Sequence, residues 1–123
     1  MKVFIKPLLL GAESAGGTAV IIDVVNASST IVECLSGGAG EVVPVRSFEE
    51  AAEIKKRSDL VCGEMKNFWK VDFYNSAYSA SKQRFSGKRV VIKTEAGTKG
   101  ILGAKKADEI IIGCFLNAGA VAL

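Results

Sequence analysis

Four segments of the sequence place polar residues where an aliphatic run ends: residues 23–30, 62–66, 93–98 and 113–118. They supply two carboxylates, Asp23 and Glu64, with Glu95 as a possible third. The other candidates are hydroxyls, glycines and an amide: Ser28, Ser29, Thr94, Gly97, Thr98 and Asn117. Hydroxyls and backbone amides bind phosphate or sulfonate oxygens, and carboxylates beside such an anion call for a metal ion, usually Mg²⁺. The set therefore indicates Mg²⁺-assisted handling of a small phosphorylated metabolite.

Each candidate also has a simpler structural explanation. Ser28 to Thr30, Thr94 and Asn117 are ordinary helix-cap residues, and Gly97 suits a turn as well as a phosphate cradle. Glu64 and Glu95 suit surface loops. Asp23 interrupts the aliphatic run VIIDVV, where a carboxylate needs a buried partner, either a capped backbone amide or a metal ion. Both interpretations of Asp23 stay open at this point.

The sequence alternates between β-branched runs and helical patterns. The expected strands are 2–5, 19–24, 41–45, 59–63, 88–93 and 108–113, and the expected helices are 28–36, 48–57 and 97–106. This alternation predicts βαβ units and a three-layer α/β fold with a mostly parallel sheet. Because the carboxyl ends of parallel strands lie at one edge, the four polar segments are expected to meet there.

Smaller signals refine this prediction. Pro44 indicates that strand 41–45 lies at a sheet edge or ends early, and Ser47 with Glu50 forms a capping box. Residues 64–87 read as a long aromatic-bearing loop with at most a short helix. Asn117 is expected to cap a helix that starts close to residue 123, which suggests a homo-oligomer or pairing with a second half.

The composition narrows the classes of function. The 123 residues fit one domain, 1–123, and the net charge of +3 is scattered, so no nucleic-acid partner is expected. The apolar runs are too short for a membrane span. Cys34, Cys62 and Cys114 show no metal or redox spacing, which is typical of free thiols in the cytoplasm. The sequence contains no histidine, so catalysis must use carboxylates, hydroxyls, Lys, Cys, backbone amides or a hard metal ion.

Five motifs in order carry a family resemblance: VIIDVVNASSTIVECLSGGAGEVVPVRSFEEA, VCGE, DFYNS, TEAGTKGI and GCFLNAGAVA. From about Val20 to the end, the chain resembles the N-terminal half of the 2-phosphosulfolactate phosphatase family of coenzyme M biosynthesis. The resemblance implies an α/β fold, Mg²⁺ dependence, and hydrolysis of 2-phospho-3-sulfolactate to 3-sulfolactate and phosphate.

The resemblance also points to individual positions. Asp23 matches the family's aspartate, and Gly63 and Glu64 match its Gly-Glu pair. The remaining matched positions are Ser28, Ser29, Thr30, Asn75, Ser76, Thr94, Gly97, Thr98 and Asn117. Asp23 and Glu64 are expected to bind the metal and take part in catalysis. Ser28, Ser29, Asn75, Thr94, Gly97, Thr98 and Asn117 are expected to bind the anionic substrate.

Three positions depart from the family pattern. Asn26 and Met65 stand where the family generally has arginine, with Lys66 as a possible substitute for the second, and Ala96 stands where it favours asparagine. Arginine grips phosphate and sulfonate in a bidentate way, so these changes weaken the expected binding of an anion. Three hypotheses remain: an active phosphatase, a catalytically degenerate homologue that binds an anion, and a structural subunit of an oligomer.

Overall fold

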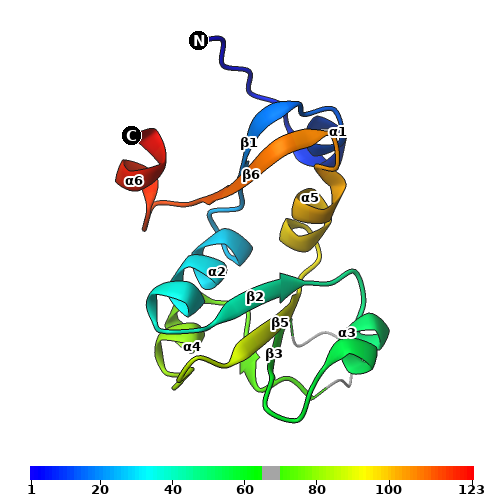
Figure 1. The fold of residues 1–123 in the computed structure, drawn as a ribbon, viewed down its shortest axis with the longest axis vertical. Helices are drawn as coiled ribbons and strands as arrows, with labels where there is room; N and C mark the ends of the chain where they lie inside the picture. Colours follow the sequence, from blue (N-terminus) through cyan, green and yellow to red (C-terminus); the bar gives the residue numbers. More distant parts are fainter. Residues whose placement is uncertain (65–69) are drawn as a thin grey trace.

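The computed structural model describes residues 1–64 and 70–123 of the chain, which alternate between short helices and strands (Figure 1). In chain order the elements are α1 (Leu8–Glu13), β1 (Gly17–Ile22), α2 (Ala27–Ser36), β2 (Glu41–Pro44), α3 (Phe48–Ile54), β3 (Leu60–Gly63), β4 (Phe73–Tyr74), α4 (Ala77–Ser81), β5 (Arg89–Lys93), α5 (Gly97–Gly103), β6 (Ala107–Gly113) and α6 (Ala118–Ala122).

The strands form two parallel sheets. One has four strands in the order β2-β5-β3-β4, and the other pairs β1 with β6. Every strand pair within the described residues is parallel. The predicted α/β class with parallel strands is therefore confirmed, and the strands divide into two sheets where the sequence suggested one.

The four-stranded sheet is covered on both faces, which makes the fold a three-layer α/β arrangement. Side chains that alternate along β5 divide between the two faces. Val90 and Ile92 pack with Ile31 and Cys34 of α2 and with Ala80 of α4. Val91 packs on the opposite face with Val45 and with Ala51 of α3. The three residues Val90, Val91 and Ile92 are fully buried, as their uninterrupted aliphatic run predicts.

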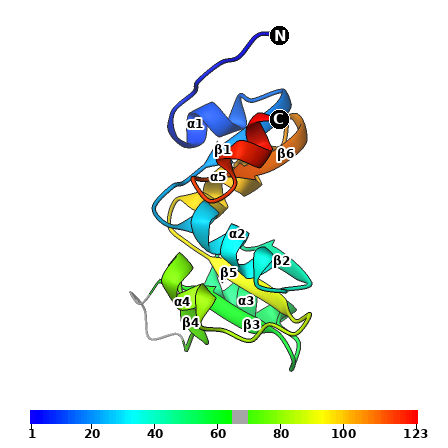
Figure 2. The ribbon, with the colours of Figure 1, turned by 90° about the vertical axis from the view of Figure 1, so that its left-hand side faces the viewer.

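The β1–β6 sheet lies at the other end of the molecule, with α2 and α5 between it and the four-stranded sheet (Figures 1 and 2). Its strands are in register from Thr18 with Glu109 to Ile22 with Gly113. Ile21 faces α5, since its Cγ2 lies 3.6 Å from the β-carbon position of Gly100. The β1–β6 sheet thus packs on the rest of the molecule through one face.

Most predicted elements are confirmed, with shifts at their ends. β2 is an edge strand that ends at Pro44, and the Ser47 hydroxyl accepts the Glu50 N–H at 3.1 Å. The predicted strand 2–5 is wrong: these residues form no strand, and the Ile5 side chain is 96 % exposed. Residues 2–5 have no neighbouring strand to pair with, and a strand of four residues is not stable by itself. The first element of the chain is helix α1. The described part of loop 64–87 contains β4 and α4.

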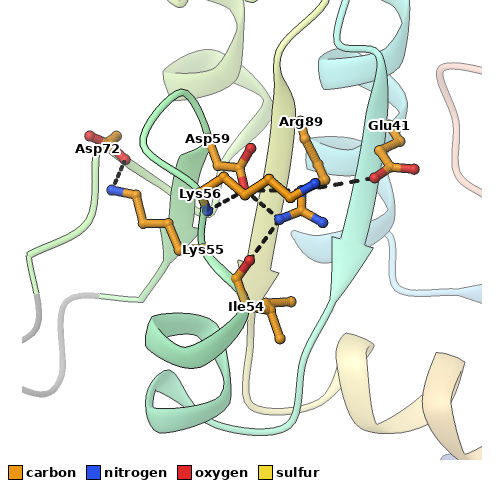
Figure 3. A network of polar contacts seen from close by, with 7 residues as sticks. All are labelled: Glu41, Ile54, Lys55, Lys56, Asp59, Asp72 and Arg89. Carbon is orange, nitrogen blue, oxygen red and sulfur yellow. Dashed lines mark hydrogen bonds and ion pairs between the residues drawn. The ribbon is translucent and has the colours of Figure 1, made fainter.

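A polar network fixes the amino end of β5 (Figure 3). The Arg89 Nε donates to Asp59 Oδ2 at 3.0 Å, and Nη2 donates to the Ile54 carbonyl at 2.8 Å. The Lys56 N–H also donates to Asp59 Oδ2, at 2.8 Å. Asp59 is only 5 % exposed, so the network ties the α3–β3 connection to the central strand.

Among the helices of the described residues, none has the length and apolar character needed to cross a bilayer.

Candidate functional site

Asp23 follows the last residue of β1 and lies in the turn that leads to α2. Its side chain is partly buried, so it does not sit inside a covered strand as the sequence pattern suggested. The Asp23 N–H donates to Ser28 Oγ at 2.9 Å. Among the hydrogen bonds of the described residues, Asp23 takes part through its backbone and not through its carboxylate, so the structure shows no capping by that side chain.

The turn from β5 into α5 is closed by Thr94 and Thr98. The Thr94 N–H donates to Thr98 Oγ1 at 3.3 Å, and the Thr98 N–H donates to Thr94 Oγ1 at 3.1 Å. The Thr98 hydroxyl in turn donates to the Thr94 carbonyl at 2.8 Å. Both side chains are at most 2 % exposed. Their observed function is to hold the start of α5 against the end of β5.

Gly97 brings the turns after β1 and β5 together. A β-carbon at this position would collide with Ala27 Cβ and lie 2.8 Å from Asp23 Oδ2. It would also lie 3.4 Å from Thr94 Oγ1. Only a residue without a side chain allows this approach, so Gly97 places the Asp23 carboxylate beside Thr94.

Glu64 reaches the same turn from β3. The register pairs Gly63 with Lys93, so Glu64 and Thr94 are the next residues on neighbouring parallel strands. Glu64 Oε1 accepts two long hydrogen bonds, from the Glu95 N–H at 3.4 Å and from Asn75 Nδ2 at 3.5 Å. The Asp23 carboxylate therefore lies beside Gly97 and the Glu64 carboxylate beside the Glu95 N–H, in the same turn.

Asn75 links this cluster to α2. Its Oδ1 accepts from the Thr30 hydroxyl at 2.8 Å, and Thr30 also lies 2.9 Å from the Asn26 carbonyl. Asn75 is 8 % exposed, so its amide is held in place between Thr30 and Glu64.

The serines of the predicted anion cradle are occupied by the loop before α2. The Ser28 hydroxyl donates to the Ile21 carbonyl at 3.4 Å, and the Ser29 hydroxyl donates to the Val24 carbonyl at 2.7 Å. Ser28 is 1 % exposed. The structure thus shows a structural use for both hydroxyls, and contact with an anion stays a prediction for them.

Asn117 closes its own loop. Its Oδ1 accepts the Cys114 N–H at 2.8 Å, and its Nδ2 donates to the Ile112 carbonyl at 2.8 Å. Ile22 pairs with Gly113, so this loop starts beside the loop that holds Asp23. Within the described residues the Asn117 amide makes no hydrogen bond to Asp23, Glu64 or the 94–98 turn, and a substrate contact by Asn117 also stays a prediction.

Lys93 is a candidate that the sequence did not single out. Its Nζ lies 2.7 Å from Glu95 Oε1 and 5.7 Å from the centroid of the Phe48 ring. The side chain is only 13 % exposed, which is unusual for lysine. Its position at the carboxyl end of β5, directly before Thr94, is the signal that marks it. It brings a positive charge to the edge where Asp23 and Glu64 lie.

Metal and thiol chemistry can be tested against the same geometry. No group of three or more His, Cys, Asp or Glu side chains suited to a metal ion occurs in residues 1–64 and 70–123. A metal site here would therefore use one or two carboxylates.

Burial raises the pKa of the Cys34 thiol to about 12, and burial also raises the pKa of Cys62. These two cysteines are protonated packing residues at neutral pH and do not act as nucleophiles.

A polar cavity of about 400 Å³ lies elsewhere, at the amino ends of β2 and β5. Its lining includes Lys56, Asp59, Lys88 and Arg89. Because Arg89 and Asp59 neutralise each other there, we interpret this cavity as the solvent-facing side of the structural network of Figure 3 and not as a ligand site.

Met65, which stands where the family generally has arginine, and Lys66, its possible substitute, lie outside the described residues.

Comparison with known proteins gives one consistent result. The family model described as 2-phosphosulpholactate phosphatase matches residues 4–123. A "Probable 2-phosphosulfolactate phosphatase" of Thermotoga maritima is 45% identical over 85% of this chain and 46% of its own length. Proteins with the same description from Thermotoga petrophila and Caldanaerobacter subterraneus are 44% and 38% identical, over 85% and 84% of this chain. The chain spans about half the length of these relatives, 46% and 45% for the last two.

Proposed function

Because the chain belongs to the 2-phosphosulfolactate phosphatase family, we propose that it takes part in Mg²⁺-dependent hydrolysis of a small anionic phosphoester. The preferred substrate is 2-phospho-3-sulfolactate. The observation that carries the proposal is that two carboxylates reach the turn after β5, Asp23 at Gly97 and Glu64 at the Glu95 N–H.

The reaction consumes one water. The water oxygen attacks phosphorus, the bond between phosphorus and the C2 oxygen breaks, and the products are 3-sulfolactate and phosphate. In the absence of histidine from the sequence, a carboxylate is the natural acceptor of the water proton. Asp23 suits this role because no described backbone amide occupies its carboxylate, whereas Glu64 Oε1 already accepts from Glu95 and Asn75.

The available oxygens fit a magnesium ion. Mg²⁺ is commonly held by one or two carboxylates together with water and the phosphate of its substrate. Asp23 and Glu64 would be these ligands, and Asn75 would orient Glu64 through its amide. When bound, the ion would neutralise the phosphate charge that two neighbouring carboxylates otherwise repel.

The remaining predicted residues would shape the anion site. Gly97 lets the Asp23 and Ala27 side chains pack against the turn, Thr94 and Thr98 fix its backbone, and Lys93 adds a charge for the phosphate or the sulfonate. Ser28 and Ser29 hold the loop before α2, and Asn117 holds the loop after β6. Through these two loops they would border the anion site. The buried free cysteines support a reducing, cytoplasmic setting for this chemistry.

Phosphate release from 2-phospho-3-sulfolactate, with and without Mg²⁺, tests the proposal. Asp23→Asn and Glu64→Gln should each lower kcat at least about a hundredfold, in line with loss of a general base or a metal ligand. The matched controls are Asp108→Asn and Glu53→Gln, two exposed carboxylates on β6 and α3. Equal rates for Asp23→Asn and Asp108→Asn would exclude Asp23 from the reaction.

A second candidate is a homologue that binds an anion without catalysis. The observation that separates it from an active phosphatase is the pair of departures at Asn26 and Ala96, where the family favours arginine and asparagine. With fewer contacts to the anion, its binding would depend on a Mg²⁺ ion held by the carboxylates of Asp23 and Glu64. This candidate predicts that inorganic phosphate with Mg²⁺ raises the melting temperature while no ester is hydrolysed. Hydrolysis that depends on Asp23 would reject it.

A further inference from the structure

The β1–β6 sheet exposes apolar side chains beside the candidate site. We call the following five residues the outer patch: Val20 (41 % exposed) and Ile22 (65 %) on β1, Val25 (80 %) in the next loop, and Phe115 (84 %) and Leu116 (58 %) after β6. Single exposed apolar residues are ordinary, whereas several on one strand and in the loops that follow two paired strands mark a contact surface.

The outer patch lies on the face that the helices do not cover. Ile21 points to Gly100 of α5, so Val20 and Ile22 point to the opposite face. There they lie over Gly113 of β6, whose β-carbon position is 2.9 Å from Val20 Cγ1 and 3.4 Å from Ile22 Cγ1. The close fit of Val20, Ile22 and Gly113 gives a flat apolar surface that extends across both strands.

The backbone of this sheet is also open. Within the part of the chain that the structure describes, β1 and β6 pair only with each other. A two-stranded sheet has little stability of its own, and its free edges accept a further strand. The neighbouring helix α6 has no buried residue, and Val20 and Ile22 stay exposed beside it.

The relatives indicate what covers this surface. Matches span 84–89% of this chain and only 45–49% of each relative. Each relative therefore has about as much polypeptide again outside the matched region. If that polypeptide packs on the matched half, the outer patch with two open strand edges offers both apolar area and backbone hydrogen bonds.

We propose that the outer face of the β1–β6 sheet is the docking surface for a polypeptide equivalent to the half of the family fold outside the matched region. The docked polypeptide adds a strand to β1 or β6 and buries Ile22 and Phe115. Since Asp23 follows Ile22 directly, the docked segment also borders the candidate site.

Co-expression tests this inference without relying on catalysis. The tagged chain is produced together with the part of the Thermotoga maritima relative that lies outside its matched region. A one-to-one complex is expected by light scattering. Amide hydrogen exchange of residues 17–22 and 107–113 should slow by about tenfold or more in the complex, because the strand amides become covered.

Matched substitutions locate the surface. Ile22→Lys places a charge in the contact and should weaken the complex by about tenfold or more. Leu35→Lys is the control, because Leu35 is 49 % exposed on α2 and lies outside the outer patch. Equal affinities for the two variants would overturn the assignment of this face.

A measurement on the whole Thermotoga maritima relative covers the case in which its isolated segment does not fold. The strand aligned with β1 should exchange more slowly in the whole protein than in its excised matched region. Equal exchange would overturn the proposal. It would also be overturned if the present chain alone formed a dimer that Ile22→Lys dissociates, because the surface would then bind a second copy. Neither result depends on phosphatase activity, so the proposed function is tested separately.

Discussion

Asp23 and Gly97 are in contact although they are 74 positions apart in the sequence (97 − 23). Asp23 Oδ2 lies 2.8 Å from the position that a β-carbon on Gly97 would take. This contact joins the turn after β1, in one sheet, to the turn after β5, in the other. The distance between Asp23 and the 94–97 turn is therefore set by the packing of one sheet against the other, and less by the order of strands within either sheet.

The first prediction follows from this contact. Gly97→Ala should destabilise the protein by about 1–3 kcal/mol, because the new methyl group collides with Ala27 and crowds Asp23. Gly119→Ala is the control, since Gly119 is also helical and has nothing within 4 Å of its β-carbon position. There alanine should be neutral or slightly stabilising. Urea unfolding measures both, and equal stability of the two variants would contradict the close approach.

The second prediction concerns the structural role of the Thr98 hydroxyl in the turn after β5. Thr98→Val keeps the shape but leaves the buried Thr94 N–H without its acceptor, which should cost about 1–3 kcal/mol of unfolding free energy. Thr98→Ser keeps the hydroxyl and should lose less. Thr18→Val, which removes an exposed hydroxyl that bonds Glu109, should change stability by at most about 0.5 kcal/mol.

Hydrolysis by the folded Thr98→Ser variant completes this test. A hydroxyl that only closes the turn predicts a kcat close to that of the wild type. If Thr98→Ser lost activity while it kept its stability, the methyl group and its packing would matter to the site beyond the hydrogen bonds.

The third prediction concerns Lys93. Lys93→Met removes a charge next to the expected anion, and a charge-assisted contact is worth about 1.5–3 kcal/mol. KM for the phosphoester should therefore rise by about ten- to a hundredfold, with a smaller change in kcat. Lys93→Arg should restore much of the loss. Lys82→Met is the control, because Lys82 is exposed at the C-cap of α4, where its ammonium lies over the Tyr78 ring. An unchanged KM in Lys93→Met would remove Lys93 from the anion site.

Much of the α/β organisation was predictable because it depends on local sequence patterns, such as aliphatic runs and proline positions. The continuous run Val90 to Ile92 predicted a strand covered on both faces, and Pro44 predicted an edge. The positions of Asp23, Glu64 and Gly97 just after strands were also visible in the sequence, and the structure brings Asp23 to Gly97 and Glu64 to Glu95, while their roles stay predictions.

The division into two sheets was not predictable from such patterns. Whether β1 pairs with β6 or joins β5 depends on contacts between distant residues, and both choices give the same alternation along the chain. Strand β4, with only Phe73 and Tyr74, is too short to show a period. The internal use of the Ser28 and Ser29 hydroxyls depends on the path of a loop, which residue types alone do not determine.

The last prediction concerns pH and the network at the amino end of β5. The hydrogen bond from Arg89 lowers the pKa of Asp59 below its ordinary value of 3.8, and the Lys56 N–H adds to this effect while burial opposes it. The same hydrogen bond raises the pKa of Arg89. Because the folded state binds the Asp59 proton less readily than the unfolded state does, ionised Asp59 stabilises the fold above its ordinary pKa.

This stabilisation is lost as the pH falls through the ordinary pKa toward the lowered one. Asp59→Asn should therefore lower the urea midpoint of unfolding at neutral pH, and its difference from the wild type should shrink as the pH falls from about 5 to about 2. Asp108→Asn, an exposed carboxylate on β6, should follow the wild type across the range. Unfolding curves at a series of pH values measure the effect. A difference between wild type and Asp59→Asn that stayed constant with pH would mean that Asp59 acts through packing and not through its charge.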